Sequence, residues 1–99
     1  MGNQIALLGN NGKYLNLCNN CWNNAVHADA AFVNGDLPTE TSLWDVKRLE
    51  NGKWAIRGSN CKYLARCRSC VTGGKNPDSV FVKDYSPNTP QAQWTVILR

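Results

Sequence analysis

The chain has 99 residues and a mass of 11.0 kDa, which suits one small domain with a single hydrophobic core. Hydrophobic residues make up 42% of it, charged residues 18%, and the formal net charge is +4, a composition that excludes a disordered polar segment and a coiled coil. No apolar run approaches the roughly 18 residues of a membrane span, and residues 1–4 lack the pattern of a secretory signal, so we expect one folded domain over residues 1–99 in the cytoplasm, with secretion left open.

Short strands separated by polar turns recur along the chain. In chain order, the predicted strands are Ile5–Leu8, Tyr14–Leu17, Ala25–Ala28, Trp44–Leu49, Trp54–Arg57, Tyr63–Arg66, Val80–Lys83 and Trp94–Leu98. Their β-branched and aromatic content and their alternation are typical of half-buried strands. Segments 34–41, 72–79 and 84–91 are rich in Gly, Pro, Asn and Asp and are predicted as surface loops. Because no segment shows a helical period with caps, the sequence predicts an all-β barrel or sandwich.

The strands fall into two copies of one unit at an offset of 49 residues. Identical pairs at this offset are Ala6/Ala55, Gly9/Gly58, Asn11/Asn60, Lys13/Lys62, Tyr14/Tyr63, Leu15/Leu64, Cys18/Cys67 and Cys21/Cys70. Trp44 and Trp94 begin similar strands at the ends of the units, whereas the middle alignment, 25–29 against 80–84, is weak. We therefore expect two tandem four-strand repeats, about 3–51 and 52–99, related by pseudo-twofold symmetry.

The turn and strand around Lys13-Tyr14-Leu15, closed by a Trp-X-Val strand, resemble the repeat of the fascin and hisactophilin superfamily and of amaranthin-type agglutinins. The second unit keeps this plan, with Cys61 in place of the last Gly of the turn. The resemblance implies a β-trefoil-like fold in which the tryptophan of each last strand fills the barrel. A β-trefoil closes with three units and this chain has two. We expect either a small closed barrel or a trefoil-like fold, as a monomer or as a homodimer that covers open edges.

Four of the five cysteines form two CxxC pairs at equivalent positions, Cys18/Cys21 and Cys67/Cys70. A pseudo-twofold axis that brings the pairs together would create a tetrahedral zinc site, and zinc is the one cofactor that the sequence indicates. Two disulfides linking the units would instead compensate for the small core. Free thiols are the third alternative, and Cys61 lies outside any symmetric scheme. The spacing does not choose among the three.

Asparagines crowd the loops around one tryptophan of the first unit, Trp22, which has no tryptophan counterpart in the second unit. The predicted ligand-binding residues are Asn10, Asn11, Asn19, Asn20, Trp22, Asn23 and Asn24. Amides can hydrogen-bond to sugar hydroxyls while an aromatic ring supports the apolar face of the sugar. We expect a lectin-like module with glycans or glycoproteins as partners. The alternative is structural, with asparagines in turns and Trp22 covering a hairpin.

The sequence offers no catalytic set. His27 is the single histidine, the carboxylates show no paired pattern, and residues 73–75 lack the spacing of a phosphate-binding loop. We therefore expect a binding protein and not an enzyme.

The second half of the chain is basic, with ten cations against three carboxylates over residues 47–99 and one cation against four carboxylates before it. A basic face including Lys53, Arg57, Arg66 and Arg68 suits an acidic filament, so actin binding or bundling is the alternative function that the resemblance implies. Nucleic acid is the least favoured partner, because no clear set of exposed aromatic residues interleaves with these cations. The same counts also fit ordinary solvated charges.

Overall fold

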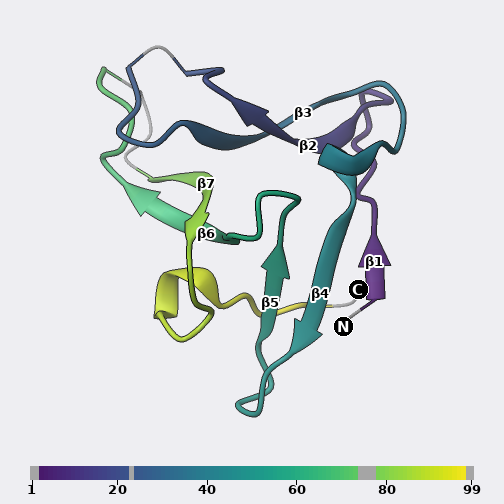
Figure 1. Ribbon diagram of the computed structural model, residues 1–99, viewed down its shortest axis with the longest axis vertical. Helices are drawn as coiled ribbons and strands as arrows, with labels where there is room; N and C mark the ends of the chain where they lie inside the picture. The colour runs from purple at the N-terminus through teal and green to yellow at the C-terminus, as the bar shows by residue number, and fades with distance from the viewer. Residues whose placement is uncertain (1–2, 23, 74–77, 98–99) are drawn as a thin grey trace.

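The computed structural model describes residues 3–22, 24–73 and 78–97 and shows an all-β protein (Figure 1). The strands are β1 (Asn3–Ile5), β2 (Tyr14–Asn19), β3 (Asp29–Gly35), β4 (Trp44–Arg48), β5 (Trp54–Arg57), β6 (Tyr63–Arg68) and β7 (Asp78–Asp84). Two single turns of 3₁₀ helix, η1 (Glu40–Ser42) and η2 (Pro90–Ala92), follow β3 and β7. In the part of the chain that the structure describes, no helix has the length and apolar character needed to cross a bilayer.

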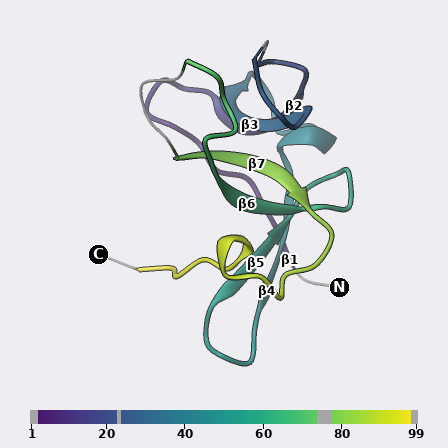
Figure 2. The ribbon, with the colours of Figure 1, turned by 90° about the vertical axis from the view of Figure 1, so that its left-hand side faces the viewer.

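The strands form one antiparallel sheet in the order β1-β4-β5-β6-β7-β3-β2. The β2–β3 and β6–β7 hairpins each contain a register shift directly after their tyrosine, Tyr14 or Tyr63. Figures 1 and 2 show that the sheet curls, with both hairpins lying toward the upper end of the β4–β5 ribbon, away from the turn that joins β4 to β5. Among the described residues β1 pairs with β4 alone, so the sheet is an open half-barrel and a closed barrel is not seen.

The predicted strands are confirmed where apolar and polar residues alternate. Trp54–Arg57 is β5, and the segments beginning at Tyr14, Tyr63 and Trp44 lie in or overlap β2, β6 and β4. The last predicted strand is wrong over its described part, since only the isolated bridge between Trp54 and Trp94 is present; Leu98 lies outside the described residues. The sheet therefore has seven strands and not two sets of four.

The third predicted strand of the first unit is also wrong. Residues 25–28 form a bridge and bends, and β3 occupies Asp29–Gly35, partly inside the predicted loop 34–41. This places β3 at an offset of 49 from β7, so that Phe32-Val33 corresponds to Phe81-Val82. The weak middle alignment failed because it set 25–29 against 80–84, six residues out of the structural register. The shared Asp-X-X-Phe-Val pattern was the sequence signal for the correct pairing.

The main core lies where the two halves of the chain meet. Leu17 and Trp44 from the first half pack with Leu64 and Val82 from the second, and Trp94 lies against this cluster. The Trp44 indole is fully buried, and its Nε1 donates to the carbonyl oxygen of Leu15 at 3.1 Å. Trp94 donates to Leu64 in the same manner at 2.9 Å. Burying a large ring with its N–H satisfied makes Trp44 the principal packing residue of the half-barrel, and the partly buried Trp94 packs against the same cluster.

Candidate functional site

The predicted sugar-binding residues fall into two groups at opposite ends of β2. Asn10 and Asn11 precede the strand, while Asn19, Asn20, Trp22 and Asn24 lie at its end or beyond. The six residues of β2 span about 17 Å at the usual rise of an extended strand. The structure therefore does not bring the whole predicted set together, and Asn23 lies outside the described residues.

The Asn11 side chain is hydrogen-bonded to the backbone of its own turn and of β3. Its Oδ1 accepts the backbone N–H of Lys13 at 3.0 Å, and its Nδ2 donates to the carbonyl oxygen of Val33 at 3.3 Å. Asn60 makes the equivalent bonds in the second half of the chain. An asparagine that closes a turn with both ends of its amide has little capacity left for a ligand. Asn11 therefore makes the turn contacts that the structural alternative predicts.

The second group lies in what we call the cystine corner, residues 18–22, 24–27 and 67–72, where the two CxxC loops meet (Figure 1, upper left). The Val26 N–H donates to the Cys70 carbonyl oxygen, and the Thr72 N–H donates to the Asn24 carbonyl oxygen, each at 2.8 Å. These bonds flank the bridge between Ala25 and Val71. Two loops 49 residues apart in sequence are thereby joined into one surface.

Each CxxC pair is closed on itself by a disulfide, Cys18–Cys21 and Cys67–Cys70, with Cα atoms 5.7 and 5.8 Å apart. The predicted disulfides between units are therefore wrong, since each bridge lies inside one loop. Cys61 is free and exposed. The structure shows disulfides where the sequence allowed a four-cysteine zinc site. The group of metal-ligating side chains that the described residues do bring together is His27, Cys67 and Cys70.

Trp22 is the exposed aromatic residue of the cystine corner, with 42% of its surface accessible. Its ring lies against Phe32, with centroids 5.4 Å apart and planes inclined by 47°. In the same loop, Asn19 Nδ2 donates to Asp29 Oδ1 at 2.7 Å, and Asn20 Nδ2 donates to Asn19 Oδ1 at 3.0 Å. Residues 18–22 thus carry a partly open ring and an ordered chain of polar groups, which offer a ligand an apolar surface and hydrogen-bonding partners.

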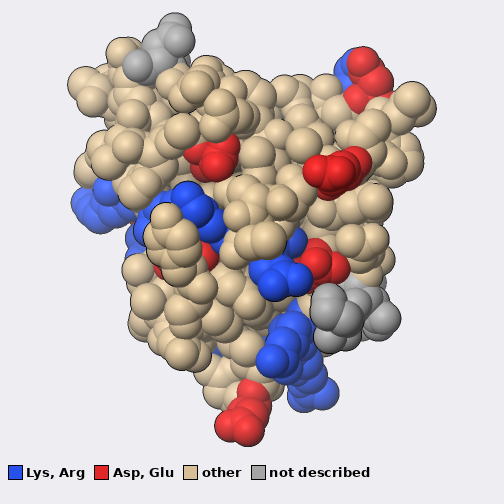
Figure 3. All heavy atoms as spheres, viewed as in Figure 1, with Lys and Arg blue, Asp and Glu red and all other residues tan. Residues whose placement is uncertain are grey.

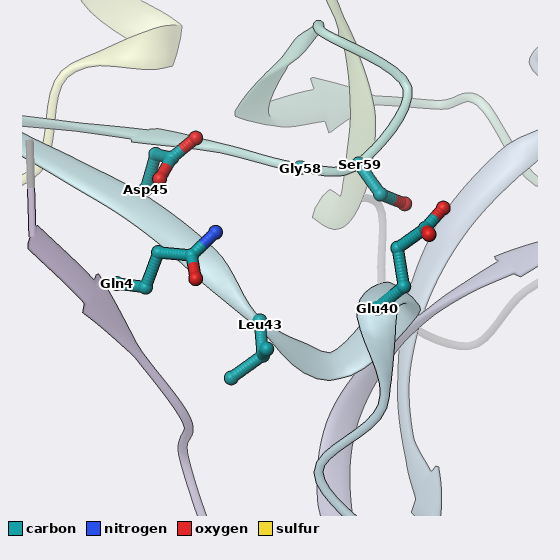
Figure 4. A pocket seen from close by; sticks show the side chains of 6 residues that line it. All are labelled: Gln4, Glu40, Leu43, Asp45, Gly58 and Ser59. Atoms are coloured by element: carbon teal, nitrogen blue, oxygen red, sulfur yellow. The ribbon is translucent and has the colours of Figure 1, made fainter. Parts of the chain in front are cut away.

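A separate pocket of about 390 Å³ lies between β1, η1, β4 and the turn after β5. It is lined by Gln4, Glu40, Leu43, Asp45, Gly58 and Ser59. Figure 4 shows the Glu40 and Ser59 side chains approaching each other on one side, with Gln4 and Asp45 on the other. Sequence reasoning missed this pocket because its residues come from four separate segments that only the curl of the sheet assembles. It offers hydrogen-bonding groups but no aromatic lining residue.

The predicted basic residues do not form one unpaired face. Lys53 lies in the turn between β4 and β5, Arg57 ends β5, and Arg66 and Arg68 lie on β6. Asp78 accepts ion pairs from Arg66 at 2.8 Å and from Arg68 at 3.8 Å, and Arg57 is paired with Asp45 at 3.3 Å. The face drawn in Figure 3 shows cations in separate groups with carboxylates between them.

Comparison with known proteins adds no relative, because no family model, curated protein or solved structure matches the chain. The resemblance to the fascin, hisactophilin and agglutinin repeats therefore stays a prediction, and the function rests on the side chains described above.

Proposed function

We propose that the chain is a non-enzymatic binding module that takes carbohydrate at the cystine corner. The observation that carries the proposal is Trp22, a large ring left 42% exposed although it lies against Phe32, in a loop that also carries hydrogen-bonded asparagine amides. A sugar ring presents one face of C–H groups and a rim of hydroxyls, so an aromatic surface with adjacent amides complements it. Glycans or glycoproteins are the corresponding partners.

The polar groups where β2 ends support this proposal because they are held in place before a ligand arrives. Asp29 accepts from Asn19 and also from Asn60, at 2.7 and 3.0 Å, and Asn19 in turn accepts from Asn20. Asn20 itself is exposed in the turn after β2, where its backbone has a φ of 60°. Groups that are already ordered lose less conformational entropy on binding.

We further propose that the half-barrel is a trefoil-like arrangement of two repeats, each consisting of a barrel strand, a hairpin and a returning segment. Equivalent hydrogen bonds support this view: Trp44 to Leu15 and Trp94 to Leu64 in the hairpin cores, and the Asn11 and Asn60 turn bonds. In this arrangement the cystine corner is the place where the two hairpin ends meet.

A glycan array tests the carbohydrate proposal. We expect the native protein to retain defined glycans with little dependence on salt, and Trp22→Ala to weaken binding at least about tenfold, which corresponds to about 1.4 kcal/mol. Tyr85→Ala is the matched control, because Tyr85 is an aromatic residue that is 82% exposed and lies outside the corner. Glu40→Ala probes the separate pocket.

Two outcomes would contradict the assignment. If the native protein retains no glycan, carbohydrate binding is wrong. If Glu40→Ala removes retention while Trp22→Ala keeps it, the ligand occupies the pocket of Figure 4 and the cystine corner is not the site.

The alternative proposal is binding to actin filaments. It is favoured by Arg66 and Arg68, whose side chains are 57% and 69% exposed and, two residues apart on β6, project from one face. We expect co-sedimentation with filaments at low salt that weakens steeply as ionic strength rises, and that Arg66→Gln with Arg68→Gln reduces. Absence of pelleting at low salt would discard this function.

A further inference from the structure

His27 and the Cys67–Cys70 cystine of the cystine corner lie close enough together for one metal ion to contact all three side chains. A ring nitrogen of His27 and the sulfur atoms of Cys67 and Cys70 all lie within 4.8 Å of one another. Both cysteines are only 6% exposed and belong to a second core cluster with Ala30 and Phe81. A histidine next to a buried cystine is a set of zinc-ligand types gathered in one place.

The fold builds this cluster from both halves of the chain. The bond from Val26 N–H to the Cys70 carbonyl oxygen fixes the residue directly before His27 against the second CxxC loop. The His27 ring also meets the Phe81 ring edge-on, with centroids 5.9 Å apart. The histidine is thereby anchored on two sides, and its position beside the sulfur atoms does not depend on the disulfide alone.

We propose that opening the Cys67–Cys70 disulfide converts this cluster into a zinc site with His27 as third ligand. In a tetrahedral site the two sulfur atoms stand about 3.8 Å apart, from zinc–sulfur bonds of about 2.3 Å. A Cys-X-X-Cys loop reaches this separation by side-chain rotation. A ring nitrogen of His27 already lies within 4.8 Å of both sulfur atoms. The fourth position is left to water or to an external ligand.

The reaction balances with one dithiol as the reductant. The dithiol gives two electrons, breaks the Cys67–Cys70 bond and becomes a disulfide itself. The two protein sulfurs bind Zn²⁺ as thiolates together with neutral His27, and the two protons that the dithiol carried are released to solvent. Metal binding therefore favours the reduced form, and oxidation of the two thiolates to the disulfide expels the metal.

The other CxxC loop is the internal control. Cys18 and Cys21 have the same spacing and the same bridge, but His27 is the single histidine of the chain and lies with the second pair. Cys21 is also exposed, whereas Cys67 and Cys70 are buried. A site that depends only on the CxxC spacing would form equally at both loops, and a site that depends on the cluster forms only at Cys67 and Cys70.

The test is metal titration of the full chain after reduction with a phosphine and its removal under nitrogen. Zn²⁺ affinity is measured by competition with a chromogenic chelator, and Co²⁺ gives sulfur-to-metal absorption as a direct sign of thiolate ligation. We expect one tight equivalent in the reduced protein and none in the oxidised protein. Cys18→Ser with Cys21→Ser should retain it, and Cys67→Ser with Cys70→Ser should lose it.

His27→Phe separates ligation from folding, because phenylalanine keeps a ring against Phe81 but has no ligand atom. We expect this variant to keep both thiols and its native near-ultraviolet circular dichroism, and to bind Zn²⁺ at least about tenfold more weakly. Equal affinity in His27→Phe, equal binding by the oxidised protein, a tight site that follows Cys18 and Cys21, or loss of the native spectrum on reduction would each overturn the proposal. Glycan retention is a separate readout, so failure here leaves the carbohydrate proposal intact.

Discussion

At the scale of single residues, Asp84 joins the end of β7 to the loop that follows it. Its carboxylate accepts Lys83 Nζ and Thr89 Oγ1, both at 2.7 Å. Burial raises the pKa of Asp84, but the hydrogen bonds from Lys83 and Thr89 and the electrostatic influence of Lys83 and His27 outweigh it, so the pKa lies below its usual value. The charged form is therefore the one that the folded state prefers.

The pH dependence of stability follows from this lowered pKa. The contribution of Asp84 is complete above the unfolded value of about 4 and is lost as pH falls through the lower folded value. We expect the free energy of unfolding, measured by urea titration from neutral pH down to pH 2, to fall more steeply below pH 4 in the native protein than in Asp84→Asn. At neutral pH the variant should be less stable by about 2 kcal/mol. Equal slopes in the two proteins would contradict the role of Asp84.

At the scale of elements, the turn after β5 is pressed into the core, and Gly58 is the residue that permits it. A Cβ at Gly58 would lie 2.9 Å from Val82 Cγ1, 3.1 Å from Trp44 Cζ3 and 3.2 Å from Leu17 Cδ1. Gly9, at the equivalent position of the first half, would meet Val33 Cγ1 at 2.8 Å, but Val33 is exposed and can move. The same sequence position is thus constrained differently in the two halves.

We therefore expect Gly58→Ala to destabilise the protein by about 1–3 kcal/mol, because the added methyl must displace buried side chains. Gly9→Ala is the matched control and should cost less, since its main neighbour is a side chain at the surface. Urea unfolding of both variants measures the difference. A smaller loss in Gly58→Ala than in Gly9→Ala would show that the core around Trp44 is not tightly packed against this turn.

At the scale of the whole molecule, neither half of the chain contains a complete core. Leu17 and Trp44 pack in one cluster with Leu64 and Val82 of the second half, and the sheet continues from β4 into β5 across the boundary between the halves. Removing either half would expose the apolar surface of the other. The free energy of unfolding therefore depends on both halves being packed together in the half-barrel.

One cooperative transition is the expected result. Tryptophan fluorescence and far-ultraviolet circular dichroism should follow the same urea curve, with a slope on the order of 1 kcal/mol per molar urea for a chain of this size. Separate peptides covering residues 1–51 and 52–99 should remain unfolded. Two resolved transitions, or a peptide that folds by itself, would show that the halves are independent units.

The sequence by itself determined the all-β class and the position of most strands, because alternation and strand-forming residues act locally. It also identified the tryptophan that fills the core and the corner residues Asn19, Asn20 and Trp22 as surface groups. It did not place β3, because the strand-like composition of 25–28 outweighed the Asp-X-X-Phe-Val pattern that β3 shares with β7; pairing with β2 and β7 fixes the strand at Asp29–Gly35.

Only the tertiary structure decided which distant residues share a surface. The two CxxC loops have identical spacing, yet His27 lies beside one of them and not the other, and Asn10 and Asn11 lie at the opposite end of a strand from the remaining asparagines. Spacing along a chain limits which neighbours a residue can reach, whereas the curl of the sheet and its register select among them. That selection depends on backbone pairing between segments about 50 residues apart, which local sequence patterns do not encode.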